Sequence, residues 1–172
     1  MMTVALDLER LPALLVGPPS ALRERADQLR AAGARDLTQH PCERLRAGEL
    51  PSLEGRRLLL LCAQELPGAE LLLEQARRRG LLLWMEDRRE FCDFHLPAVV
   101  RRGDLTISIS TAGRSPALAR RLRRHLESLF PEHWAARLEE IGDLRDRLRR
   151  RGATAGEING ATERLLVERG WL

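Results

Sequence analysis

The residues most suggestive of chemistry form one short run of hydroxyl-bearing and small side chains, Ser110-Thr111-Ala112-Gly113-Arg114-Ser115-Pro116. Ser115 followed by Pro116 is typical of a helix start, with serine as the N-cap and proline in the first helical position. The free N–H groups at the start of a helix attract anions. The run therefore predicts an anion-binding loop at the beginning of a helix.

The residues on either side indicate how this loop is positioned. Residues 105–110 alternate leucine or isoleucine with threonine or serine, which predicts a strand with one buried and one polar face. A loop closed by Pro97 and a basic turn, residues 101–104, come before it. A long, arginine-rich helix follows from Ser115. The sequence thus predicts a strand, loop and helix in direct succession.

The first half of the chain predicts strands that alternate with helices. Continuous apolar runs are typical of parallel strands buried on both faces. We expect strands at residues 11–16, 35–39 (ended by Pro41), 56–63 and 81–85, and helices at 21–32, capped by Ser20, and 68–79. This alternation predicts an α/β fold with a parallel sheet.

The C-terminal part changes character and predicts helices only. Residues 133–151 carry apolar side chains at spacings of three and four, and residues 154–170 predict one more helix. These helices are too few for an independent domain. Their narrow apolar stripes are expected to pack on the rest of the chain or on a second subunit.

Composition limits the classes of partner. All 29 basic residues are arginine, the net charge is +4 and the pI is about 10.0, which favours an acidic partner, although a high-GC genome would also enrich arginine. An aromatic content of 3% argues against a stacking platform for single-stranded nucleic acid, and no helix-turn-helix pattern is present. The basic stretch at 145–151 includes Asp146, which favours a solvated helix face over a nucleic-acid patch.

Other features indicate the cellular setting. The three cysteines lack the spacing of a metal site and are interpreted as reduced and structural. No apolar run is long enough to span a bilayer, and the N-terminus shows no signal-peptide pattern. We expect a soluble cytoplasmic protein.

Two stretches resemble a known family, the N-terminal module of siroheme synthase and its stand-alone forms. These are FHLPAVVRRGDLTISISTAGRSPALARRLRRHLESLFPEH (94–133) and ALDLERLPALLVG (5–17). Members are precorrin-2 dehydrogenases that often also act as sirohydrochlorin ferrochelatases. The resemblance implies a homodimer with a Rossmann-like NAD-binding-type domain (1–92), a strand-containing dimerisation and substrate segment (93–130) and a C-terminal helical region (131–172).

The resemblance implies a catalytic carboxylate at Asp87, seven residues before Phe94. In such a family the aspartate would remove protons during oxidation of precorrin-2. It would also guide the substrate metal, Fe²⁺ or Co²⁺, during insertion into sirohydrochlorin. The alternative is that Asp87 only begins a turn or caps a helix starting at Arg88.

The resemblance also implies a binding surface for an acidic tetrapyrrole, either precorrin-2 or sirohydrochlorin. Thr111 occupies the position where relatives carry serine or threonine next to the substrate. The full set of candidates is Ser110, Thr111, Gly113, Ser115, Arg114 and Arg120, with Arg121 as a further arginine. An ordinary capped helix with a solvated basic face remains the alternative for the arginines.

The implied NAD site is altered. Its candidate residues are Gly17, Ser20, Ala63 and Gln64, but Pro18 and Pro19 stand where the family has glycines. Proline has no N–H and brings a bulky ring, so two phosphate donors are lost.

Two functions follow. The first is a siroheme-biosynthesis enzyme acting as dehydrogenase, chelatase or both. The second is a relative that has lost NAD binding and acts as a chelatase only, or binds a tetrapyrrole or a partner enzyme without catalysis.

Overall fold

The computed structural model describes residues 3–172, which divide into two compact units. The first unit ends at His95 and the second runs from Leu96 to Leu172. The finer predicted division into residues 93–130 and 131–172 stays a prediction. Among the described residues no helix is long and apolar enough to cross a membrane.

The first unit is built around a four-stranded parallel sheet in the order β2-β1-β3-β4. The central strands β1 and β3 consist of apolar residues and glycine and are buried along their whole length, as expected for a parallel sheet covered on both faces. The strands are β1 (Ala13–Gly17), β2 (Leu37–Pro41), β3 (Leu58–Leu61) and β4 (Leu82–Met85).

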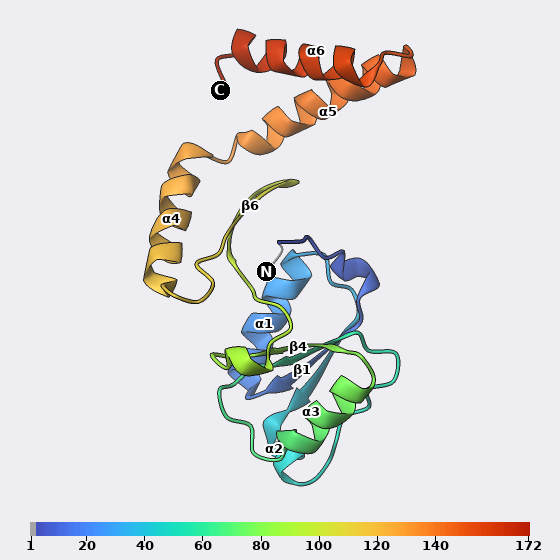
Figure 1. Cartoon of the computed structure of the whole chain (residues 1–172), viewed down its shortest axis with the longest axis vertical. Coiled ribbons are helices and arrows are strands. Elements are labelled where there is room, and N and C mark those ends of the chain that lie inside the picture. Colours follow the sequence, from blue (N-terminus) through green and yellow to red (C-terminus); the bar gives the residue numbers. More distant parts are fainter. Residues whose placement is uncertain (1–2) are drawn as a thin grey trace. The chain divides into compact units, whose positions relative to one another are not determined.

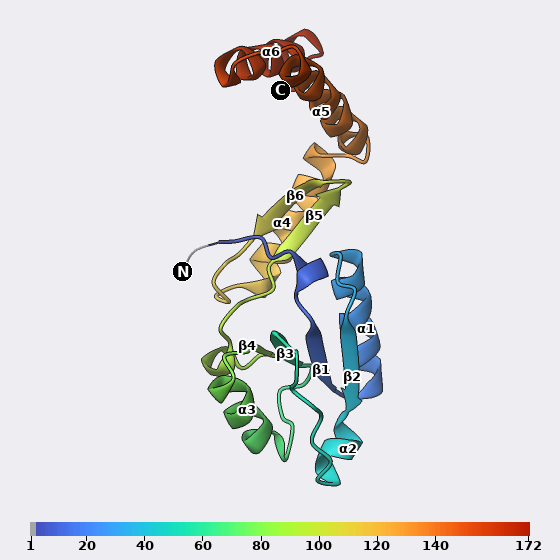
Figure 2. The same cartoon turned by 90° about the vertical axis from the view of Figure 1, so that its right-hand side faces the viewer.

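Helices cover both faces of this sheet (Figures 1 and 2). The buried stripe of α1 (Pro19–Ala31) packs with alternate residues of β1, β3 and β4. α2 (Cys42–Arg46) and α3 (Ala69–Arg78) pack with the intervening residues on the other face. Two short 3-10 turns, η1 (Leu8–Arg10) and η2 (Arg89–Phe91), precede β1 and follow β4. The prediction of an α/β fold with a parallel sheet is confirmed.

The second unit is an antiparallel hairpin with three helices. β5 (Ala98–Arg102) and β6 (Leu105–Ile109) join through a turn at Gly103, whose φ of 56° favours glycine. α4 packs on this hairpin, while α5 packs on α6 and on β6. The helices are α4 (Pro116–Leu129), α5 (Trp134–Arg150) and α6 (Ala155–Glu168).

Two predictions about local structure are wrong. Ser20 does not cap α1: Pro18 is the N-cap and Pro19 the first helical residue, because proline presets the backbone angle that a first helical turn requires. Arg101 and Arg102 lie in β5 rather than in a turn. Arg102 is 9% exposed because its guanidinium turns inward.

Arg102 closes the C-terminal end of α4. Its Nε donates to the carbonyl oxygen of Phe130 at 2.6 Å and its Nη2 to that of Glu127 at 3.4 Å. The last carbonyls of a helix have no partner within the helix, so a guanidinium fork can satisfy them. This contact fixes the end of α4 against the hairpin.

Candidate functional site

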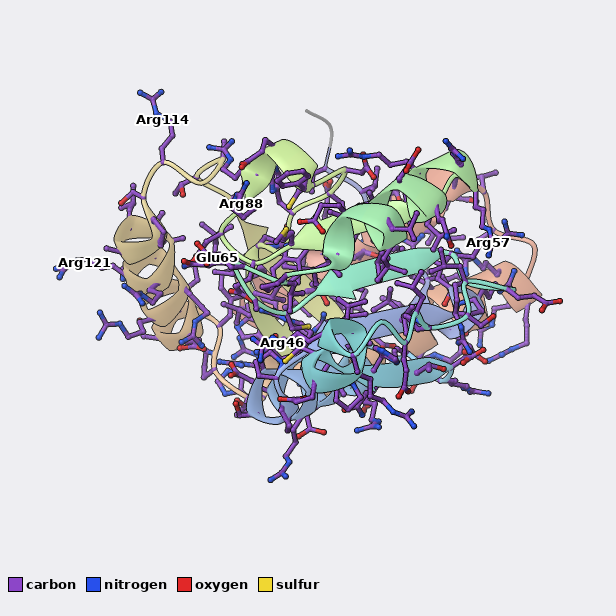
Figure 3. All side chains as sticks on the ribbon, turned by 90° about the horizontal axis from the view of Figure 1, so that it is seen from below. Arg46, Arg57, Glu65, Arg88, Arg114 and Arg121 are labelled. Carbon is purple, nitrogen blue, oxygen red and sulfur yellow. The ribbon has the colours of Figure 1, made fainter. Side chains whose placement is uncertain are left out.

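The first group of candidate residues lies at the carboxyl edge of the parallel sheet. Gly17 ends β1, Ala63 and Gln64 follow β3, and Asp87 follows β4. Strands that run parallel end at the same edge, and α/β sheets bind ligands there. Figure 3 shows Glu65 and Arg88 at this edge and Arg57 at the opposite end of the strands.

Asp87 is exposed and has an unusual backbone. Its φ is 51°, in the left-handed region, within a turn that the N–H of Arg88 closes on the carbonyl of Met85 at 3.4 Å. Aspartate adopts this region more readily than most residues do. The Nε2 of Gln64 donates to Asp87 Oδ2 at 2.6 Å. Two predicted site residues, 23 positions apart in sequence, are therefore in direct contact and fix one carboxylate.

The residue before Asp87 is anchored by a contact that sequence analysis did not predict. Arg25 of α1 donates to Glu86 Oε2 at 2.9 Å, and its guanidinium carbon lies 4.4 Å from the centre of the Trp84 ring. A guanidinium over an indole face adds a cation–π attraction to the ion pair. These two contacts of Arg25 anchor Trp84 and Glu86, which closely precede Asp87. Arg25 and Glu86 are 61 positions apart, so their pairing leaves no pattern in the sequence.

Gly17 is required by the close approach of β1 and β3. A Cβ at this position would lie 3.0 Å from Cys62 Cβ and 3.1 Å from its carbonyl oxygen. Burial raises the pKa of the Cys62 thiol to about 11, against an opposing effect of Arg25. The thiol is therefore protonated at neutral pH and is no nucleophile, since nucleophilic attack requires the thiolate.

The start of α1 is the phosphate position of a Rossmann-like fold. The helix has no side-chain cap, and its first backbone bond joins the N–H of Leu22 to the carbonyl of Pro18 at 3.0 Å. The N–H groups of Ser20 and Ala21 have no acceptor within the helix, so they and the Ser20 hydroxyl can meet a phosphate. Pro18 and Pro19 provide no donor. This edge of the sheet can therefore hold a dinucleotide pyrophosphate, but with fewer backbone N–H donors than a glycine loop would provide.

The second group of candidates forms one loop in the second unit. The carbonyl of Thr111 accepts from the N–H of Arg114 at 3.0 Å, which places Ala112 (φ 50°) and Gly113 (φ 72°) at the tip of a tight turn. Ser110 Oγ accepts from the N–H of Ala112 at 3.2 Å. The hydroxyl hydrogen of Ser110 remains free to donate to a ligand.

The other two hydroxyls shape the start of α4. Thr111 Oγ1 accepts from the N–H of Ser115 and donates to its carbonyl, both at 3.2 Å. Ser115 Oγ caps the helix by accepting from the N–H of Leu118 at 3.2 Å, as predicted. Thr111 is thus committed to the loop itself, and Ser115 keeps its hydroxyl hydrogen for a ligand.

The candidate arginines beside this loop are free of counter-charges. Arg114, Arg120 and Arg121 are exposed. Within residues 3–172 none of them has an ion-pair partner, whereas Arg123 on the same helix pairs with Glu127 at 2.6 Å. Figure 3 shows the side chains of Arg114 and Arg121 extending away from the ribbon. Such arginines can bind ligand carboxylates through two hydrogen bonds each.

The described residues contain no cluster of potential metal ligands. Across residues 3–172 no three or more His, Cys, Asp or Glu side chains gather closely enough to hold an ion. The role of Asp87 toward a substrate metal ion stays a prediction.

Comparisons with known proteins agree with the resemblance. Residues 102–129 match the family described as sirohaem biosynthesis protein, central. The chain is 32% identical to siroheme synthase 1 of Pectobacterium atrosepticum over 95% of its own length, and 31% identical to siroheme synthase 1 of Aeromonas salmonicida over 92%. It spans 37% of the length of each of these relatives.

A solved structure described as SirC, precorrin-2 dehydrogenase, shares the fold. It superimposes with a TM-score of 0.65 at 20% sequence identity, over 96% of this chain and 89% of that one. The match includes both the parallel sheet and the hairpin with its helices. Over nearly its whole length the chain is thus similar to part of the siroheme synthases, and it shares the fold of a precorrin-2 dehydrogenase.

Proposed function

We propose that this chain is an enzyme of siroheme biosynthesis that oxidises precorrin-2 to sirohydrochlorin with NAD⁺, inserts Fe²⁺ or Co²⁺ into sirohydrochlorin, or does both. The observation that carries the proposal is Asp87. It is an exposed carboxylate at the carboxyl edge of a Rossmann-like sheet, held by Gln64 at 2.6 Å and by a left-handed backbone. A carboxylate fixed in this way suits repeated proton removal.

Both reactions release protons that Asp87 would accept. Oxidation of precorrin-2 removes a hydride and a proton, and NAD⁺, when bound, takes the hydride. Insertion of a divalent metal displaces two pyrrole protons. Asp87 would take a proton in either case, while the Gln64 amide holds the carboxylate in one orientation. Glu86 stays paired with Arg25 and is not free to take this role.

The remaining candidates are assigned to binding. The N–H groups of Ser20 and Ala21 would hold the NAD⁺ pyrophosphate, with Gly17, Ala63 and Gln64 along the same edge. In the second unit, the free hydroxyls of Ser110 and Ser115 would bind tetrapyrrole carboxylates, with Thr111 holding the loop in shape. Gly113, Arg114 and Arg120 would complete this surface. We propose a homodimer as the working form, and a separate enzyme of tetrapyrrole synthesis as its second partner.

Titration with NAD⁺ tests the cofactor half of the proposal. Because Pro18 and Pro19 lack N–H groups, replacing both with glycine restores two donors and should tighten NAD⁺ binding at least tenfold in a calorimetric titration. Matched assays then follow precorrin-2 oxidation and Fe²⁺ or Co²⁺ insertion by the unaltered chain. Metal insertion without NAD⁺ binding would mean that the protein is a chelatase and not a dehydrogenase. The absence of both reactions would contradict the proposal.

A further inference from the structure

A hollow in the second unit gathers much of the chain's aromatic content. It has a volume of about 390 Å³ and lies where α4 ends, α5 begins and the last residues of the chain return. Phe130, Trp134 and Trp171 line it, together with Arg137 and His133. The chain has only three tryptophans and three phenylalanines, so three of six such rings lie around this one hollow.

Arg137 is held between two indole rings. Its guanidinium carbon lies 4.8 Å from the centre of the Trp134 ring and 5.0 Å from that of Trp171. Trp134 is itself buried and contacts Phe130 with ring centres 5.2 Å apart. α6 runs back along α5 (Figure 1). Trp171, which follows α6, lies beside Arg137 in the first turn of α5. Cation–π contacts with two indoles fix the orientation of the guanidinium plane.

Among the described residues no acidic side chain is paired with the guanidinium of Arg137. Within residues 3–172 its side chain forms no ion pair and no hydrogen bond. The nearby carboxylates are committed elsewhere: Glu132 pairs with Arg102 at 3.2 Å and Glu140 with Arg169 at 2.6 Å. No acidic side chain lines the hollow. An arginine has five N–H donors, and here all of them are left for a ligand.

We propose that this hollow binds a planar conjugated ring that carries a carboxylate. The apolar residues that line the hollow, among them Leu129, Pro131 and Phe130, suit the body of an aromatic ring. The N–H edge of the guanidinium, whose face lies on the indoles, suits a carboxylate through two parallel hydrogen bonds. A volume of about 390 Å³ is at the small end of ligand pockets, so it accepts one or two fused rings. This site involves none of the residues assigned to the proposed reaction and does not depend on it.

The test is a titration of the full chain with 2-naphthoate. Binding is monitored by nuclear magnetic resonance through the indole N–H signals of the protein's three tryptophans. The signals of Trp134 and Trp171 should shift with saturation below about 1 mM, while that of Trp84 stays in place. The neutral analogue 2-naphthalenemethanol has the same ring without the charge and should bind at least tenfold more weakly.

Two variants separate charge from shape. Arg137→Gln should weaken 2-naphthoate binding at least tenfold, whereas Arg147→Gln, an exposed arginine on the same helix, should not change it. Equal binding of the neutral analogue, or unchanged binding by Arg137→Gln, would overturn the proposal. Signals of Trp134 and Trp171 that move with protein concentration instead of ligand would also overturn it and assign the hollow to self-association.

Discussion

Replacing Cys62 with alanine will remove most of the alkaline sensitivity of this protein's stability. Burial raises the pKa of the Cys62 thiol from its ordinary value of 9.0 to about 11, with Arg25 opposing and Glu86 adding to the effect. In the unfolded chain the thiol ionises near its ordinary value. Between pH 9 and pH 11 the unfolded state therefore binds fewer protons than the folded state, and the free energy of unfolding falls as pH rises.

The magnitude follows from the difference between these two pKa values. A difference of about 2 corresponds to ~2.7 kcal/mol once both states are fully ionised, and to about 2 kcal/mol at pH 11 itself. The chain has no lysine and no tyrosine, so among its side chains the other groups that titrate in this range are the thiols of Cys42 and Cys92. Cys42 and Cys92, whose pKa values are also raised chiefly by burial, add smaller losses of the same sign.

Urea unfolding at pH 8 and pH 11, with a reducing agent present, measures the effect. The unaltered protein should lose about 2 kcal/mol more over this interval than Cys62→Ala. Cys42→Ala serves as a matched control and should retain most of the loss. An equal loss in the unaltered protein and in Cys62→Ala would refute the assignment of a buried, protonated thiol at the end of β3.

Two further predictions concern packing. Gly17→Ala should lower the free energy of unfolding by about 1–3 kcal/mol, because the new methyl group would lie 3.0 Å from Cys62 Cβ. Thermal unfolding measures this loss, and an unchanged melting temperature would contradict it. Arg102→Ala should lower the free energy of unfolding by about 2–4 kcal/mol, because it leaves the carbonyls of Glu127 and Phe130 without their donor. Urea unfolding measures this loss, and a loss below about 0.5 kcal/mol would argue against the closure of α4 by Arg102.

The sheet was predictable because its residues act locally. Runs such as residues 58–61 consist only of leucine, and a strand that is apolar on both faces has no stable place except inside a covered sheet. The loop before α4 was predictable for a similar reason: Ser115 and Pro116 set the helix start through their own side chains. Gln64 and Asp87 were both predicted, although not their contact.

The parts that were missed depend on contacts between distant residues. The end of β5 was not predicted because Arg101 and Arg102 directly precede Gly103 and Asp104 and were assigned to the same turn. Burial of Arg102 becomes favourable only through partners such as the carbonyls at the end of α4 and Glu132, which lie 25 to 30 residues further along the chain. The clamp of Arg25 on Trp84 and Glu86 requires α1 to lie on β4, which no periodicity in either segment indicates. Ser20 failed as a cap because Pro18 and Pro19 set the helix start two residues earlier.

The rate of precorrin-2 oxidation by Asp87→Asn tests the central claim most directly. Asparagine tolerates the left-handed φ of 51° and cannot accept a proton, so the fold should persist while the rate falls by about 10²–10⁴. Glu65→Gln removes a carboxylate from the same edge of the sheet and should leave the rate unchanged. A folded Asp87→Asn variant that keeps more than about a third of the rate would contradict the role assigned to this carboxylate.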